Sequence, residues 1–93
     1  MRIYEFALVL TEETGRDETK AKKLVSDLVA ELKGKVIDSK ILGVRDLAYP
    51  IRKATRGWYG IFNVELSEDS GPELEKQVKM NEKILRHLLV RGG

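Results

Sequence analysis

Residues 17–34 read DETKAKKLVSDLVAELKG, and the pattern in this stretch is the clearest structural signal in the chain. Its apolar residues recur at spacings of three and four, as on one face of an α-helix; they are Ala21, Leu24, Val25, Leu28, Val29 and Leu32. Asp17 is a suitable N-cap, and Gly34 supplies a helix stop. The sequence therefore predicts an amphipathic helix between Asp17 and Gly34.

Strand patterns flank this helix on both sides. Residues 2–10 alternate so that Tyr4, Phe6, Leu8 and Leu10 share an apolar face. After the helix, residues 35–49 predict a long strand with a bulge near Gly43, where the alternation breaks. We expect this strand to end near Tyr49-Pro50, because proline cannot donate to a sheet ladder, and residues 53–57 to form a basic hairpin loop.

The rest of the chain predicts a strand, a helix and a final strand. Residues 58–66 carry Phe62, Val64 and Leu66 on one face and Tyr59 and Ile61 on the other. Ser70 and Glu73 have the spacing of a capping box at the start of a short helix, with Ser70 as N-cap. Asn81 is expected to adopt a left-handed cap before a fourth strand at residues 84–90.

The expected order is β-α-β-β-α-β, which is the ferredoxin-like arrangement of the α+β class. It gives a four-stranded antiparallel sheet with strands one and three in the middle and two helices on one face, because the crossovers are right-handed. A chain of 93 residues has room for one core, so residues 1–93 are expected to form a single domain.

Composition excludes several classes of protein. Hydrophobic residues make up 42% and charged residues 34% of the chain, which is typical of a soluble globular domain and not of a disordered one. Cysteine is absent, which excludes disulfides, thiol catalysis and cysteine-bound zinc. No apolar run approaches the roughly 20 residues of a membrane span, and the start of the chain does not read as a secretory signal. We therefore expect a cytoplasmic protein.

Charge is unevenly distributed although the net charge is only +2. Residues 35–57 carry 6 basic and 2 acidic residues, and residues 76–93 carry 5 basic residues and 1 acidic residue. Residues 58–75, in contrast, carry 5 acidic residues and no basic residue. If the fold joins the two basic segments, the resulting patch would suit a polyanion. The alternative is an ordinary surface of mixed charge.

The sequence offers little for catalysis. The single histidine, His87, lies in an expected strand without triad partners, and no phosphate-binding glycine motif is present. We expect no enzyme activity, no cofactor and no metal site. A small ferredoxin-like enzyme or ligand-binding regulatory domain stays open as the alternative, since small phosphate-cleaving enzymes use this architecture. Such enzymes need an anion-cradling arginine loop after the first strand, and here that loop is acidic.

Binding to RNA fits the pattern better. Residues 56–62, RGWYGIF, are similar to the basic, glycine and aromatic opening of an RNA recognition motif. Base stacking would need aromatic residues on the open face, however, and Tyr4, Phe6 and Phe62 have the parity of the core. The sequence therefore favours arginine contacts to the phosphates of folded RNA.

Residues 43–52, GVRDLAYPIR, closely resemble the signature of the bacterial ribosomal small-subunit protein six family. The likeness extends to an opening Met-Arg-x-Tyr-Glu, to Gly57-Trp58-Tyr59, and to residues 81–86, NEKILR. It implies a ferredoxin-like fold without catalysis. It also implies binding to the central domain of small-subunit ribosomal RNA together with ribosomal small-subunit protein eighteen.

The resemblance also suggests which residues make these contacts. The basic residues expected to contact RNA at signature positions are Arg45, Arg52 and Arg86. Further candidates are Arg2, Lys53 and Arg91. The expected contacts to the partner protein are Tyr49, Tyr59 and Ile61. Many relatives continue into a polar tail, whereas this chain ends at Arg91-Gly92-Gly93, so we expect its contacts to rest on the core surface.

Overall fold

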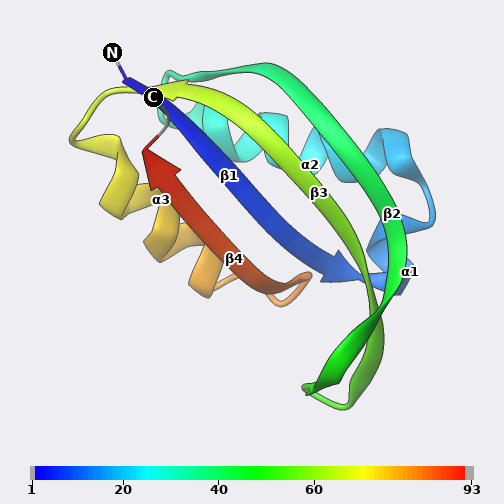
Figure 1. Cartoon of the computed structure of the whole chain (residues 1–93). Helices are drawn as coiled ribbons and strands as arrows, with labels where there is room; N and C mark the ends of the chain where they lie inside the picture. Colours follow the sequence, from blue (N-terminus) through cyan, green and yellow to red (C-terminus); the bar gives the residue numbers. More distant parts are fainter. Residues whose placement is uncertain (1, 92–93) are drawn as a thin grey trace.

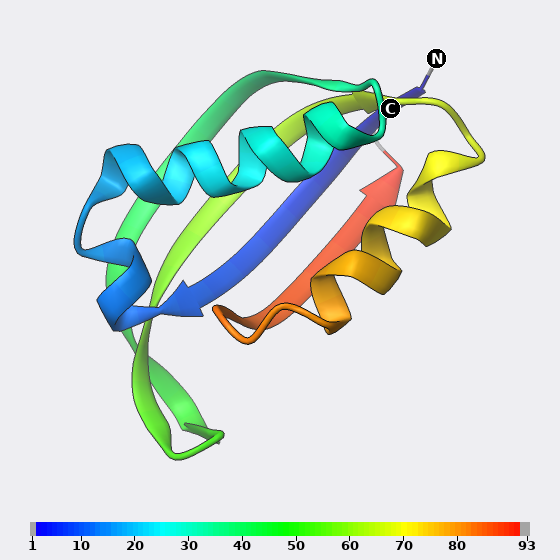
Figure 2. The same ribbon diagram turned by 180° about the vertical axis from the view of Figure 1, so that it is seen from behind.

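The computed structural model describes residues 2–91. The elements follow in the order β1 (Arg2–Thr11), α1 (Glu12–Gly15), α2 (Glu18–Glu31), β2 (Lys35–Ile51), β3 (Ala54–Leu66), α3 (Ser70–Lys79) and β4 (Ile84–Arg91). The strands form one antiparallel sheet in the order β2-β3-β1-β4. Helices α2 and α3 cover one face and leave the other open (Figures 1 and 2). The predicted ferredoxin-like α+β fold is therefore confirmed. None of the helices within residues 2–91 is long and apolar enough to cross a membrane.

The core lies between the sheet and the two long helices. Its largest fully buried side chains include Trp58, Phe6 and Phe62 from the two central strands. Helix α2 contributes Ala21, Val25 and Val29, at the helical spacing that the sequence shows. Burying such a face is what holds an amphipathic helix in place, since helix propensity alone is weak.

Helix α2 begins as predicted and ends differently. The Asp17 side chain caps it by accepting the backbone N–H of Lys20 at 3.2 Å. At the other end the left-handed residue is Lys33, with φ of 62°, and not Gly34. Gly34 is needed for a different reason: a Cβ there would overlap the carbonyl oxygen of Glu65 and the side chain of Leu66. The glycine allows the chain to pass close to the sheet.

Three local predictions are wrong. The acidic turn after β1 forms the short helix α1, which Thr11 caps by accepting the Thr14 N–H at 3.2 Å. Ser70 is the first residue of α3 and not its N-cap; its hydroxyl lies 2.8 Å from that of Ser67. Asn81 does not have a positive φ, and its side chain instead accepts the Lys83 N–H at 2.9 Å. In each case a short polar side chain, of Thr11, Ser70 or Asn81, makes a local hydrogen bond that the sequence pattern did not predict.

The β2–β3 hairpin is longer than expected. The predicted bulge is present between Ile41 and Gly43, where Gly43 has a φ of 80°. Strand β2 then continues through Pro50, and β3 begins at Ala54, so residues 53–57 are not a loop. Pro50 is tolerated because β2 is an edge strand and the ladder is irregular between Asp46 and Ile51. Since β1 pairs with β3 only as far as Gly57, residues 46–56 project as a two-stranded ribbon that we call the hairpin arm.

Candidate nucleic-acid interface

The open face of the sheet carries an apolar groove. Residues paired across antiparallel strands share a face, so the register aligns Ala7 with Ile61 and Leu88 on the side away from the helices. Tyr59 lies on the same side, one pleat closer to the hairpin arm. Together with Leu42 they line a shallow groove of about 370 Å³. The prediction that Tyr59 and Ile61 face away from the helices is confirmed.

Two apolar residues of this groove were not predicted from the sequence. Leu88 is 60% exposed and Leu42 is 36% exposed. Leu88 could have been found from the alternation within residues 86–90, where it lies two residues from Arg86 and shares its face. The position of Leu42 could not, because the bulge beside it shifts the parity of the strand.

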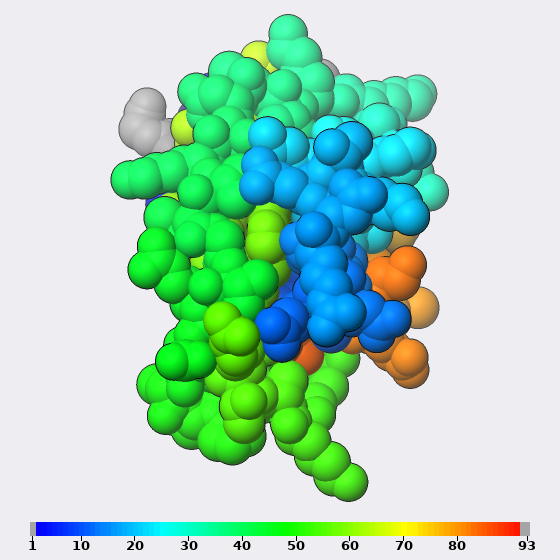
Figure 3. All heavy atoms as spheres, turned by 90° about the vertical axis from the view of Figure 1, so that its right-hand side faces the viewer, coloured from blue at the N-terminus to red at the C-terminus, as the bar shows by residue number. Residues whose placement is uncertain are grey.

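The hairpin arm folds over one end of the open face. Leu47, Ile51 and Tyr49 surround a small cavity of about 100 Å³ together with Val9 and Tyr59. Val9 is 6% exposed although it does not belong to the cluster under the helices. The arm therefore has its own apolar contact with the sheet. Figure 3, which views the molecule from the side of β2 and α1, shows the arm extending beyond the body of the molecule.

An arginine and a tyrosine join the arm to β4. Arg86 Nη2 donates a hydrogen bond to Tyr49 Oη at 3.2 Å, and its guanidinium carbon lies 5.6 Å from the centroid of the Tyr49 ring. This hydrogen bond, and then the positive charge of Arg86, lower the pKa of the Tyr49 phenol. Tyr49 is 60% exposed, so its ring stays accessible to a binding partner.

A second arginine, Arg52, joins the tip of the arm to the residues around the start of β4. Arg52 Nη1 donates to the carbonyl oxygen of Glu82 at 3.2 Å, and Arg52 Nη2 donates to that of Ile84 at 3.1 Å. Its neighbour Lys53 is exposed at the same tip. Arg45 lies at the base of the arm, where its Nε donates to the carbonyl oxygen of Leu42 at 3.1 Å.

The structure divides the predicted RNA-binding residues into two groups. Arg45 lies at the base of the arm, Arg52 and Lys53 at its tip and Arg86 beside it on β4, whereas Arg2 and Arg91 lie toward the opposite end of β1 and β4. Arg2 forms an ion pair with Glu68, and Arg91 pairs with Tyr4 in the sheet. Arg2 lies seven residue steps along β1 from Val9, which pairs with Arg86, and Arg91 lies five steps along β4 from Arg86. These separations are about 23 Å and about 17 Å. RNA contacts by Arg2 and Arg91 would therefore lie apart from those at the arm.

Arg56, also on the arm, has acidic neighbours. Its guanidinium lies 3.3 Å from a carboxylate oxygen of Glu12 and 3.3 Å from one of Asp46. These pairs offset the acids beside the arm. Within residues 2–91, Arg45, Lys53 and Arg86 form no ion pair, so no acidic partner offsets their charges directly.

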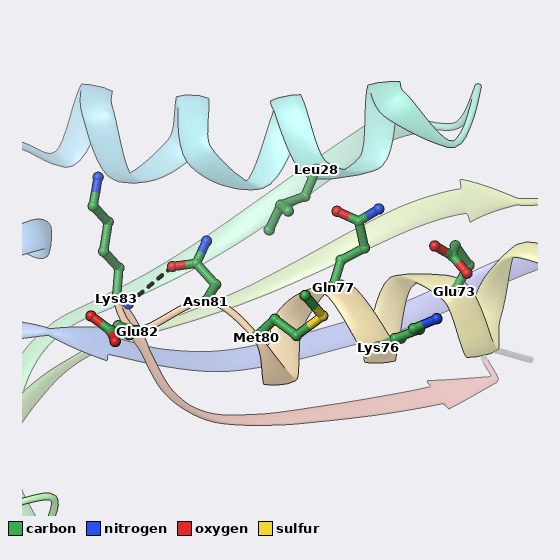
Figure 4. Close-up of a pocket in the computed structure, with 8 residues that line it drawn as sticks. All are labelled: Leu28, Glu73, Lys76, Gln77, Met80, Asn81, Glu82 and Lys83. Atoms are coloured by element: carbon green, nitrogen blue, oxygen red, sulfur yellow. Dashed lines mark hydrogen bonds between the residues drawn. The ribbon is translucent and has the colours of Figure 1, made fainter.

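The helix side of the molecule has a hollow of a different kind. Between α2 and α3, Leu28 and Met80 line a depression of about 680 Å³ (Figure 4). Its rim alternates acids and lysines; these are Glu73, Lys76, Glu82 and Lys83. A mixed rim of this kind offers a polyanion no net attraction. Among the described residues there is also no group of three side chains that could hold a metal ion.

The chain is similar to known proteins over nearly its whole length. The model of the family described as Ribosomal protein S6 matches residues 3–91. The chain is 34% identical to small ribosomal subunit protein bS6 of Caldanaerobacter subterraneus over 92 residues, which cover 98% of this chain and 97% of that protein. It is 31% identical to the bS6 protein of Dictyoglomus turgidum, covering 96% and 93% of the two chains.

The fold has a close counterpart among solved structures. The crystal structure of 30S ribosomal protein S6 from Thermotoga maritima superposes with a TM-score of 0.78 at 26% identity, covering 98% of this chain and 87% of that one. The relatives are structural proteins of the ribosome, so the alternative of a small enzyme is not supported. On this likeness over nearly its whole length, the chain belongs to the ribosomal protein S6 family and is a cytoplasmic protein of the small ribosomal subunit.

Proposed function

We propose that this chain acts as a single RNA-binding domain that binds the central domain of small-subunit ribosomal RNA together with ribosomal small-subunit protein eighteen. The observation that carries this proposal is the gathering of Arg45, Arg52, Lys53 and Arg86 beside an apolar groove on the open face of the sheet. One end of that face suits a polyanion, and its middle suits a protein.

The RNA would meet the cationic end of the open face. Arginine contacts to phosphate oxygens are charge-assisted and can be bidentate. They position a folded RNA without reading its bases. The aromatic residues Trp58 and Phe62 are buried in the core and unavailable for stacking on bases. This favours recognition of RNA shape and backbone. Contacts by Arg2 and Arg91, which lie about 23 Å and about 17 Å from Arg86 along the strands, would need RNA that extends along the sheet.

The partner protein would cover the groove. Ile61 and Tyr59 form its floor, Leu42 and Leu88 are exposed at its sides, and Tyr49 borders it on the arm. An exposed apolar surface with a polar rim is typical of a protein-binding site. Because the groove adjoins the cationic end, one partner could contact both this chain and the RNA.

The proposal is tested by titrating binding to a central-domain RNA fragment against salt, with and without protein eighteen. We expect salt-sensitive binding that protein eighteen strengthens, since phosphate contacts release counterions and the groove adds protein contacts. An affinity for RNA that does not respond to protein eighteen would remove the partner from the proposal. Absence of RNA binding in both titrations would refute it entirely.

A further inference from the structure

We infer that Arg52 contributes to RNA binding as a positioning residue: its guanidinium holds the hairpin arm against β4, and the phosphate contacts are made by its neighbours. This inference rests on the proposed function. It assigns different roles to two adjacent cations, Arg52 and Lys53, at the tip of the same arm.

The tip of the arm has an unfavourable backbone for its residues. Ile51 pairs with Ala54, so the turn consists of Arg52 and Lys53 alone. Both have positive φ, 49° and 69°. Turns of this kind favour asparagine and glycine, because a Cβ is strained in the left-handed region. Two long side chains at these positions therefore need support from elsewhere in the structure.

Arg52 supplies that support through contacts far away in sequence. Two different nitrogens of its guanidinium donate to the carbonyl oxygens of Glu82 and Ile84, thirty and thirty-two residues further along. These carbonyls belong to the connection between α3 and β4 and to the first residue of β4. A planar guanidinium can bridge two acceptors in this way, whereas an ammonium on a flexible stem cannot present the same fork.

The consequence for RNA is indirect. The arm carries Lys53 at its tip and Tyr49 on its flank, and Arg45 lies beside its base. Fixing the tip against β4 holds Lys53 and Tyr49 beside β4 and avoids an ordering cost on binding. Arg52 itself has two of its donors already committed to the protein. Removing it should loosen the arm while leaving the number of phosphate contacts unchanged.

The test compares Arg52→Met, Arg52→Lys and Lys53→Met in the full chain. Amide hydrogen exchange at Ile51 and Ala54 reports the order of the arm. The slope of log affinity for the central-domain RNA fragment against log salt reports the number of phosphate contacts. Lys53→Met is the matched control, because it removes a neighbouring charge from the same turn without touching the bridge to β4.

We expect both Arg52 variants to accelerate exchange at Ile51 and Ala54 by about tenfold, since each loses the charge-assisted fork. RNA binding should weaken by a smaller factor, because the apparent affinity follows the fraction of the chain whose arm is in place. The salt slopes of both variants should match the wild type. Lys53→Met should leave exchange unchanged and reduce the slope by about 0.7 to 0.9.

Two results would overturn the inference. Unchanged exchange in Arg52→Met would show that the bridge does not hold the arm. Normal binding by Arg52→Lys, together with a reduced slope in Arg52→Met, would make Arg52 a phosphate contact. If the wild-type chain binds no RNA at all, the proposed function fails, and the exchange data still decide whether Arg52 holds the arm.

Discussion

The two faces of the sheet are built for different purposes. The face under α2 and α3 buries a continuous apolar cluster. Among the described residues, the buried hydrophobic residues outside this cluster are Val9 and Leu85, which lie on the open face. The middle of the open face leaves Leu88 60% exposed. Stability is therefore concentrated on the helix side, and the surface left free for binding lies opposite.

Adjacent residues of β3 allow this difference to be measured directly. Phe62 is 1% exposed in the core, while Ile61 is half-buried in the groove. We expect Phe62→Ala to lower the free energy of unfolding by about 3 to 5 kcal/mol, because it leaves a cavity. Ile61→Ala should cost only about 1 kcal/mol.

Urea denaturation of both variants checks this expectation. For a small domain the larger loss is a substantial part of the total stability. Equal losses in the two variants would mean that the open face contributes to stability as much as the core does. Stability would then not be concentrated on the helix side.

The second prediction concerns binding of the partner protein. Leu88→Arg places a charge in the apolar groove, and burying it without a partner is costly. We expect it to weaken the effect of protein eighteen on RNA binding by at least about tenfold, and to change stability by less than about 1 kcal/mol.

Met80→Arg is the matched control for the groove. Met80 is 76% exposed on the helix side, in the depression of mixed charge. The same substitution there should leave the effect of protein eighteen intact. A loss in Met80→Arg that equals the loss in Leu88→Arg would place the partner elsewhere.

The third prediction separates the cationic end of the open face from the lysines of α2. Arg45→Ala should reduce the salt slope of RNA binding by about 0.7 to 0.9, since it removes one phosphate contact. Lys22→Ala removes a lysine that pairs with Glu18 at 3.5 Å on α2, and its slope should equal that of the wild type. A reduced slope in Lys22→Ala with a normal one in Arg45→Ala would move the RNA to the helix side.

The smallest expected effect is a change in the titration of Tyr49. Arg86 lowers the pKa of the Tyr49 phenol from its ordinary value of 10.0. The phenolate of Tyr49 is therefore more favourable in the folded than in the unfolded chain. The resulting stabilisation of the folded state is complete above the pKa of the unfolded chain and is lost as the pH falls through the lower pKa of the folded chain.

Ultraviolet absorbance of the phenolate measures this shift. The wild type should begin to ionise at lower pH than Arg86→Met, and Tyr49→Phe should remove the early component. Identical titration curves for the wild type and Arg86→Met would show that the contact between arm and β4 does not persist in solution.

Much of this arrangement could be predicted from residue patterns alone. The alternation of β1 and β3 assigned Phe6, Phe62 and Val64 to the core and Tyr59 and Ile61 to the open face, because period two leaves only two choices. The spacing of apolar residues in α2 likewise fixed its buried face. These are local regularities, and they suffice where an element packs on one side.

The hairpin arm could not be predicted in the same way. Pro50 suggested the end of a strand, but the proline is tolerated because β2 lies at the edge of the sheet, which is a property of the topology. Arg52 and Lys53 are poor turn residues by composition. Their turn depends on acceptors at Glu82 and Ile84, which are distant in sequence. Long-range contacts of this kind override local preference.

Methyl NMR of the chain, alone and in complex with protein eighteen and the RNA fragment, shows directly whether binding occurs on the open face. We expect shifted or broadened signals for Leu42, Ile61 and Leu88, with those of Leu24 and Leu28 on α2 unchanged. Perturbation confined to Leu24 and Leu28 would instead place binding on the helix side.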